Sequence, residues 1–312
     1  MCVRKSHIPR CGESYDMQTP TVRHWALLGY LVFFWGFAFG LIAMALEAFH
    51  PVAVVWSRLT LGAVVMLLIL RLRRGRIPLS GRWPLRMVLL SVTGNVIPFT
   101  LIAWAEQRVA SGEVGLLMAL MPIAILVMGH YFLEHERMTP FRLIGVAMGF
   151  AGVTLLMGDT VFAGSEQQRL WGQIAAVTAT MCYAINGIYT KRLPGFDPVA
   201  ITAGSLVAGS LILLAPALWL QEWSHPTLNP TAWGALLVLG VFSTGVATWV
   251  YFVVVSEVGP GFLSTINYLI PALAFIVGVV LLKEPVLANQ LVALAAILAG
   301  VWLIQPKRPL SG

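Results

Sequence analysis

Long apolar stretches alternate with short polar segments along the whole chain. Ten stretches contain no Asp, Glu, Lys or Arg, and they cover residues 25–46, 59–70, 87–105, 114–133, 143–158, 170–190, 198–221, 231–256, 258–282 and 285–306. A helix of about 20 apolar residues crosses the roughly 30 Å hydrocarbon core of a bilayer. Most stretches have this length, and the second reaches it when extended back to Val52 across Arg58. The pattern predicts an all-α membrane protein with ten transmembrane helices.

The composition agrees with this prediction. The 312 residues are 58% hydrophobic and 11% charged, unlike those of soluble globular domains. The first apolar stretch is too long for a signal-peptide core and lacks an A-x-A-like cleavage site, so we expect a retained helix. Residues 1–24 are expected to form a polar cytoplasmic tail, in which Met17 is a candidate start of translation.

Basic residues are distributed unevenly over the expected loops. With the N-terminus inside, 16 of the 20 Lys and Arg residues fall in inner segments and three in outer loops, while Arg58 lies within a helix. Lys and Arg accumulate on the cytoplasmic side of short loops. We therefore predict that both termini are cytoplasmic, in a bacterial inner membrane. The net charge of +7 then reflects topology, since a nucleic-acid interface would need basic residues on one soluble face.

The chain also contains an internal repeat. The segment FHPVAVVWSRLTLGA at 49–63 resembles FDPVAITAGSLVAGS at 196–210. Three pairs of matching residues are separated by 147 to 149 positions: Pro51 and Pro198, Pro122 and Pro271, and Gly152 and Gly300. Each copy spans five expected helices, 25–158 and 170–306, and because five is odd the second copy enters the membrane from the opposite side. Inverted repeats of this kind are typical of secondary transporters, whose substrate site lies near the membrane midplane.

Short motifs in both copies resemble the EamA family of the drug/metabolite transporter superfamily. These motifs are W-G-x-x-F at Trp35, P-V-A-x-x-x-x-R from Pro51, A-L-M-P ending at Pro122, E-x-x-T at Glu136, Y-L-I-P ending at Pro271, L-K-E-P ending at Pro285, and A-G-V at Gly152 and Gly300. The resemblance covers roughly residues 25–305. It implies a ten-helix transporter, often a metabolite or amino-acid exporter, with a cavity lined by helices 1–4 and 6–9 and with helices 5 and 10 peripheral.

Polar and aromatic side chains inside the apolar stretches are candidates for lining such a cavity. Asn95, Asn267 and Tyr268 lie midway along their expected helices, as does Trp35. A buried amide without partners costs several kcal/mol in an apolar medium, so these groups are expected to face one another, water or a substrate. The alternatives are hydrogen bonds between helices for the two amides and packing for the two aromatic residues.

Two charged residues are further candidates. Arg58 is expected to face the cavity and attract anionic groups of a substrate, since its counterpart in the second copy is the neutral Ser205. Snorkelling to headgroups, or pairing with Glu47 or Glu113, is the alternative. No pair of carboxylates lies at matching depth, and Glu113 is the only acid expected within the membrane. Glu113 either complements a helix dipole or couples transport to protons.

The prolines of the repeat suggest where helices bend. Pro122 and Pro271 occupy matching positions within expected helices, where each removes a backbone hydrogen bond. Such bends serve either as gates or as static kinks. Small residues in the fifth and tenth helices, Gly152 and Gly300 among them, predict close helix contacts within or between chains.

Enzyme and metal signatures are weak. His130, Glu134 and His135 read H-x-x-x-E-H, one residue longer than the known zinc motif. The chain has no phosphate-binding G-x-x-x-x-G-K-[ST] loop and no matched pair of carboxylates, and its three cysteines suggest free thiols. We expect no cofactor, metal or nucleic acid. The pattern favours a secondary transporter that exports small organic metabolites; a lipid or amphiphile flippase and an intramembrane enzyme are the alternatives.

Overall fold

The computed structural model describes residues 19–132, 138–163, 167–193, 196–221 and 229–304. This described part is built from helices and contains no strand, so the all-α class is confirmed. Several sequence-based expectations lie outside the described residues: those on Met17, Glu134, His135 and Glu136.

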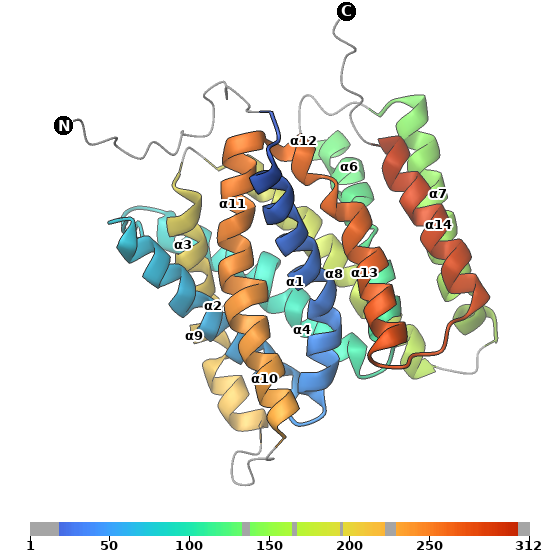
Figure 1. Cartoon of the computed structure of the whole chain (residues 1–312), viewed down its shortest axis with the longest axis horizontal. Coiled ribbons are helices and arrows are strands. Elements are labelled where there is room, and N and C mark those ends of the chain that lie inside the picture. The colour runs from blue at the N-terminus through green and yellow to red at the C-terminus, as the bar shows by residue number, and fades with distance from the viewer. Residues whose placement is uncertain (1–18, 133–137, 164–166, 194–195, 222–228, 305–312) are drawn as a thin grey trace, which may run out of the picture.

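The helices follow one another through two halves of the chain. The first half contains α1 (Val22–Leu46), α2 (Pro51–Leu72), α3 (Trp83–Ser91), the π-helix η1 (Val92–Val96), α4 (Ile97–Glu106), α5 (Ser111–Met118), α6 (Met121–Phe132) and α7 (Pro140–Ala163). The second half contains α8 (Gln167–Lys191), α9 (Pro198–Leu220), α10 (Pro230–Val238), the π-helix η2 (Leu239–Val246), α11 (Ala247–Val258), α12 (Pro260–Leu263), α13 (Ile266–Val280) and α14 (Ala288–Ile304). Figure 1 shows them as a bundle.

Among the described residues, seven helical segments are long and apolar enough to cross a membrane. They are Val22–Leu46, Pro51–Leu72, Trp83–Glu106, Ser111–Phe132, Pro140–Gly158, Pro198–Leu220 and Pro230–Val258. The apolar helices α13 and α14 are shorter, with 15 and 17 residues. Helix α8 has 25 residues but carries several polar side chains, of which Gln173 and Thr180 are buried. The count of ten crossings therefore stays a prediction.

The repeated P-V-A motif forms matching helix starts. Pro51 and Pro198 are the first residues of α2 and α9, where proline lacks an N–H that would have no partner anyway. The preceding side chains cap the helices: Nδ1 of His50 accepts from the Val52 N–H at 3.3 Å, and Oδ1 of Asp197 from the Val199 N–H at 3.0 Å. The repeated segment thus forms the same kind of helix start in both halves.

Contacts between the halves occur in exchanged pairs. Helix α1 packs against α13, and α8, its equivalent in the second half, packs against α6. In the same way α2 packs against η2, and its equivalent α9 packs against α3 and η1. The pairs α2–α9 and α7–α14 join equivalent helices. The two π-helices begin 147 residues apart, at Val92 and Leu239, which is the spacing of the sequence repeat. Each half therefore has the same local irregularity at the same place.

Helix α5 lies at the centre of the bundle, with every residue from Ser111 to Leu117 buried. Its N-terminus is capped by a residue of the second half. Oε1 of Glu284 accepts from the Ser111 N–H (2.7 Å) and hydroxyl (2.9 Å), and Oε2 accepts from the Gly112 N–H (3.0 Å). Lys283 adopts a left-handed conformation, with φ of 55°, in the turn that presents this carboxylate. The L-K-E-P motif thus supplies an anion to a helix N-terminus.

Helices α7 and α14 stand side by side at one edge of the molecule (Figure 1). Their backbones approach closely through glycines. A Cβ atom added to Gly300 would lie 2.5 Å from the carbonyl oxygen of Gly145 and 2.9 Å from the backbone nitrogen of Gly149. The small residues noted in the sequence therefore form a contact within one chain.

Candidate substrate cavity

A cavity of about 1440 Å³ lies between the two halves of the bundle. Its walls come from the C-terminal part of α2, from α3 and η1, and, in the second half, from the end of α8, the start of α9 and from α11. The volume exceeds the roughly 300–1,000 Å³ of typical small-molecule pockets. Both halves of the chain therefore contribute to one space large enough for a small organic solute.

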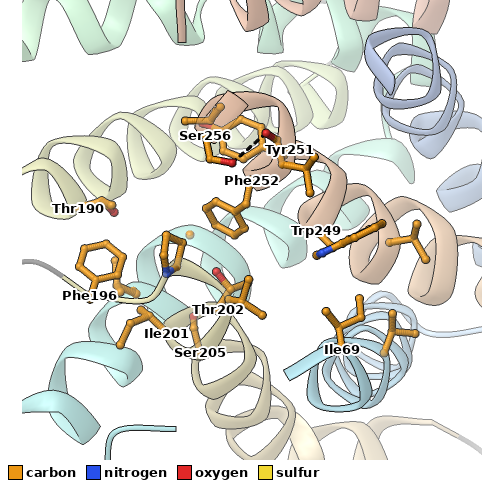
Figure 2. A pocket seen from close by; sticks show the side chains of 18 of the residues that line it. Ile69, Thr190, Phe196, Ile201, Thr202, Ser205, Trp249, Tyr251, Phe252 and Ser256 are labelled. Atoms are coloured by element: carbon orange, nitrogen blue, oxygen red, sulfur yellow. Dashed lines mark hydrogen bonds between the residues drawn. The ribbon is translucent and has the colours of Figure 1, made fainter. Parts of the chain in front are cut away.

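The cavity wall combines small polar groups with aromatic rings. Its polar residues include Asn95, Asn186, Thr190, Thr202, Ser205 and Ser256, and its aromatic residues are Phe196, Trp249, Tyr251 and Phe252. In Figure 2, Phe252 and Trp249 of α11 lie across the cavity from Thr202 of α9. Amides and hydroxyls bind polar groups, and aromatic faces bind apolar or cationic ones. Such a wall suits small amphiphilic solutes.

Charged residues line one end of the cavity. Arg23, Arg73, Lys191 and Glu257 lie there, close to ends of α1, α2, α8 and α11. Arg23 donates to Oε2 of Glu257 at 2.6 Å. In the orientation predicted from the basic residues, this end faces the cytoplasm.

A buried histidine strengthens the contact between α1 and α11. Nδ1 of His24 accepts from the Thr21 N–H at 3.0 Å, so its Nε2 carries the proton and donates to Oε2 of Glu257 at 2.9 Å. His24 is buried although Arg23 beside it is exposed. The pair ties the start of α1 to the end of α11 at the edge of the cavity.

The first π-helix presents Asn95 to the cavity. Nδ2 of Asn95 donates to the Ser205 hydroxyl at 3.2 Å, which links η1 to α9. Asn186 of α8 donates to the Leu90 carbonyl at 3.0 Å and to the Thr93 hydroxyl at 2.9 Å. Gly94 permits this approach, because an added Cβ would lie 2.7 Å from Nδ2 of Asn186. π-Helical turns occur frequently at functional sites, and this one gathers the amides of two helices.

The second π-helix holds Arg58. Nε of Arg58 donates to the Thr244 hydroxyl at 2.7 Å, and that hydroxyl donates to the Leu239 carbonyl at 2.8 Å. The guanidinium lies 3.8 Å from the centre of the Phe99 ring. Arg58 is 7% exposed and does not line the cavity described above. Its counterpart Ser205 bonds to the first π-helix, so matching positions of α2 and α9 each hold the π-helix of the other half.

Other predicted cavity residues lie elsewhere. Nε1 of Trp35 donates to the Ser243 carbonyl of η2 at 2.9 Å, and its ring contacts Tyr251. Asn267 and Tyr268 lie in the first turn of α13, away from this cavity, and the buried Tyr268 hydroxyl has no described partner. Of the six residues predicted from sequence, Asn95 lines the cavity described here. The roles of the others stay predictions.

The two prolines lie near irregular helix geometry. Pro122 is the second residue of α6, directly after the interruption between α5 and α6. Pro271 lies inside α13, a few residues after the interruption between α12 and α13. Both positions fit bending points, and their role as gates stays a prediction.

The two acids near the predicted outer side differ in their environments. Glu113 is 2% exposed; Oε2 accepts from Arg169 at 2.8 Å and Oε1 from Gln173 at 2.5 Å. Helix α4 extends through Glu106, whose two carboxylate oxygens are buried and have no hydrogen-bond partner among the described residues. Glu113 is therefore not the only acid in a segment long and apolar enough to cross a membrane, since Trp83–Glu106 is another such segment. The sequence misled because an acid at the end of an apolar stretch looks like a solvated helix end.

Several cavity residues were missed by the sequence reasoning. Asn186 and the aromatic residues of α11 lie inside long apolar stretches, as Asn95 does. A polar or aromatic side chain within such a stretch was the signal that could have identified them. The low hydropathy of α8 was a further sign that it faces a polar space. Within the described residues no group of three His, Cys, Asp or Glu side chains could hold a metal ion.

The chain matches proteins that are named as transporters. A protein named "Uncharacterized transporter" from Archaeoglobus fulgidus is 26% identical over 92% of this chain and 100% of its own length. The "Uncharacterized inner membrane transporter YedA" of Escherichia coli K12 is 25% identical over 88% of each chain. A "Probable terminal-alkyne amino-acid exporter" from Streptantibioticus cattleyicolor is 27% identical over 90% of this chain and 92% of its own.

Structural and family comparisons agree. A crystal structure superposes with a TM-score of 0.64 at 20% identity, covering 90% of this chain and 96% of that chain, and supports the fold. The model of the EamA-like transporter family matches twice, at residues 24–158 and 170–305. With its apolar helices and this double match, the chain is an integral membrane protein that belongs to the EamA-like transporter family.

Proposed function

We propose that this protein is a secondary transporter that exports small organic metabolites, with amino acids and related compounds as the first class to test. The observation that carries the proposal is the cavity of about 1440 Å³ shared by both halves. Its amides, hydroxyls and aromatic rings suit solutes that have polar groups and an apolar body. Asn95 lines this cavity from η1, and its proposed role is to bind a polar group of the solute.

The relatives support the direction and the location. The Streptantibioticus relative is named an amino-acid exporter, and the Escherichia coli relative is named an inner membrane transporter. A cavity open toward the cytoplasm is the state in which an exporter receives its substrate. In the orientation predicted from the basic residues, the charged end of this cavity faces the cytoplasm.

Alternating access is the proposed mechanism. Ten helices in two inverted repeats would expose the shared cavity to either side as the halves exchange conformations. The exchanged helix contacts support this arrangement, since each half already holds the other in an equivalent way. In the opposite state Trp35, Asn267 and Tyr268 would line the path, and the bends near Pro122 and Pro271 would open and close it.

The cavity is tested by filling it. Thr202→Trp places an indole where a small hydroxyl lines the space, so it is expected to abolish most transport. Leu211→Trp is the matched control, because Leu211 lies on the same helix, is 66% exposed and is not part of the cavity wall. Uptake or efflux of a mixed amino-acid pool by proteoliposomes, read by mass spectrometry, measures the difference.

Two results would contradict the proposal. Equal transport by both tryptophan variants would remove the cavity from the pathway. Transport of no solute, together with movement of labelled phospholipid between the leaflets of the same vesicles, would favour a flippase instead. Circular dichroism and size-exclusion chromatography establish that both variants are folded.

The inverted topology makes its own prediction. In a variant without native cysteines, Ser80→Cys in the loop before α3 should be cytoplasmic and Val286→Cys in the loop before α14 should be outside. Both positions are exposed. A membrane-impermeant maleimide is expected to label Val286→Cys in intact cells and Ser80→Cys only after permeabilisation. Labelling of both in intact cells would contradict an arrangement with five crossings in each half.

A further inference from the structure

We propose that Glu106, the last residue of α4, is a proton-binding site that couples transport to the proton gradient. Proton binding at this carboxylate stands by itself, whereas the coupling rests on the transport function proposed above. Glu113, the acid expected from sequence, is engaged by Arg169 and Gln173 and is given a structural role.

The carboxylate of Glu106 has an unusual environment. Both of its oxygens are shielded from solvent, although part of the side chain is accessible, and neither oxygen accepts a hydrogen bond from a described residue. An ionised carboxylate in an apolar environment without a donor carries a large desolvation cost. Intramembrane acids with such surroundings commonly take part in proton relays. An acid held without a donor is therefore a candidate for reversible proton binding.

Charged and titratable groups near Glu106 come from several elements. Helices α1, α2, α5 and α8 pack against α4, along with η1. Arg58 on α2 and Glu284 after α13 act on the Glu106 carboxylate electrostatically, and Tyr183 on α8 interacts with the same Arg58. Glu47 follows α1 and accepts a hydrogen bond from Asn229 at 3.4 Å. The acid on α5 is Glu113, and η1 carries no titratable side chain.

A proton fits this site better than a metal cation does. Hard cations need about six oxygen ligands. The described residues contain no group of three metal-binding side chains. A proton needs a single oxygen and forms one O–H bond on the Glu106 carboxylate. The site therefore points to a proton as its ligand.

A series of interactions connects Glu106 to the cavity. Arg58, which acts on Glu106 electrostatically, donates a hydrogen bond to the Thr244 hydroxyl of η2. The residues Val246 and Trp249, which follow Thr244 along the same helical span, line the cavity. Ionised Glu106 attracts the Arg58 guanidinium. Protonated Glu106 does not, and Arg58 then keeps its hydrogen bond to Thr244. Protonation would thus bias the contact between α2 and η2, which is the kind of differential interaction that shifts a conformational equilibrium.

Direct titration tests the proton site without any substrate. Infrared difference spectra of the purified protein, recorded as pH is changed, report the carbonyl band of a protonated carboxylic acid. Wild type is expected to show a pH-dependent band from a buried acid, and Glu106→Gln is expected to lose it. Glu47→Gln, which changes an exposed acid, should retain it. Persistence of the band in Glu106→Gln, or its absence from wild type, would overturn the proton site.

A second variant covers the case in which Glu106→Gln does not yield folded protein. Glu106→Asp keeps a carboxyl group on a shorter side chain, so the band should remain but its titration midpoint should move. An unmoved midpoint in folded Glu106→Asp would assign the band to another acid and refute the proposal.

Coupling is tested in proteoliposomes with an amino-acid pool and an imposed pH gradient. The gradient should accelerate wild-type transport, whereas Glu106→Gln should retain exchange at equal pH and lose the acceleration. A full response to the gradient in Glu106→Gln would exclude coupling through this residue. Failure of wild type to transport any compound would count against the proposed function, while the titration alone would still decide whether Glu106 binds a proton.

Discussion

Glu113→Gln is expected to destabilise the protein strongly while leaving the response to a pH gradient in place. Glu113 is 2% exposed and pairs with Arg169, while Gln173 donates to its other oxygen. Removing one partner of a buried ion pair typically costs about 3–5 kcal/mol, because the other charge keeps its desolvation cost. The Arg169 side chain is 22% exposed, so water compensates part of this loss and the lower end of the range applies.

Thermal unfolding in detergent measures this effect. Glu47→Gln is the control, since it makes the same chemical change at an exposed position and should leave the unfolding temperature near that of wild type. Wild-type stability of Glu113→Gln would show that the ion pair contributes little. Loss of the gradient response in a folded Glu113→Gln protein would transfer the coupling role from Glu106 to Glu113.

Gly300→Ala is expected to weaken the packing of α7 against α14, although alanine favours a helix. The new methyl group would lie 2.5 Å from the Gly145 carbonyl oxygen and 2.9 Å from the Gly149 nitrogen. These are backbone atoms, which cannot rotate away as a side chain can, so the helices must separate. Overpacking of this kind typically costs about 1–3 kcal/mol, and more when backbone must shift.

Gly29→Ala gives the matched control with the opposite sign. Gly29 lies within α1, and an added Cβ would meet no atom of the described residues within 4 Å. The higher helix propensity of alanine should then stabilise the protein by up to about 1 kcal/mol. Unfolding temperatures of both variants, read by intrinsic fluorescence, test the pair. Stabilisation by Gly300→Ala would contradict the close approach of the two helices.

The helical, membrane-spanning character of this chain followed from its sequence. A helix in hydrocarbon satisfies its own backbone hydrogen bonds, so the need for apolar side chains is local and appears as long stretches without charge. The repeat was equally visible, because the helix starts at Pro51 and Pro198 depend on proline at the first position and on the preceding side chain, which caps an N–H two residues further on. The family followed from the order of short motifs in both copies.

The functional partners of the polar residues depended on tertiary structure. Asn95 meets Ser205 from 110 residues away, and Arg58 meets Thr244 from 186 residues away. Sequence spacing places such residues at a depth within their helices but does not say which helices become neighbours. The π-helices that present Asn95 and Thr244 were not predicted.

Glu106 and Glu113 show most clearly what the sequence determines and what the tertiary structure determines. Both acids stand beside apolar stretches, and from the sequence alone Glu113 was expected to be the only acid within the membrane. Folding brings Arg169 and Gln173 to Glu113, whereas no described residue donates to Glu106. The local pattern determined that these residues are helical and near the membrane, since backbone hydrogen bonding and apolar burial act over short distances. Which carboxylate is neutralised depended on side chains about 60 residues away along the chain, which only the packing of α8 brings into contact.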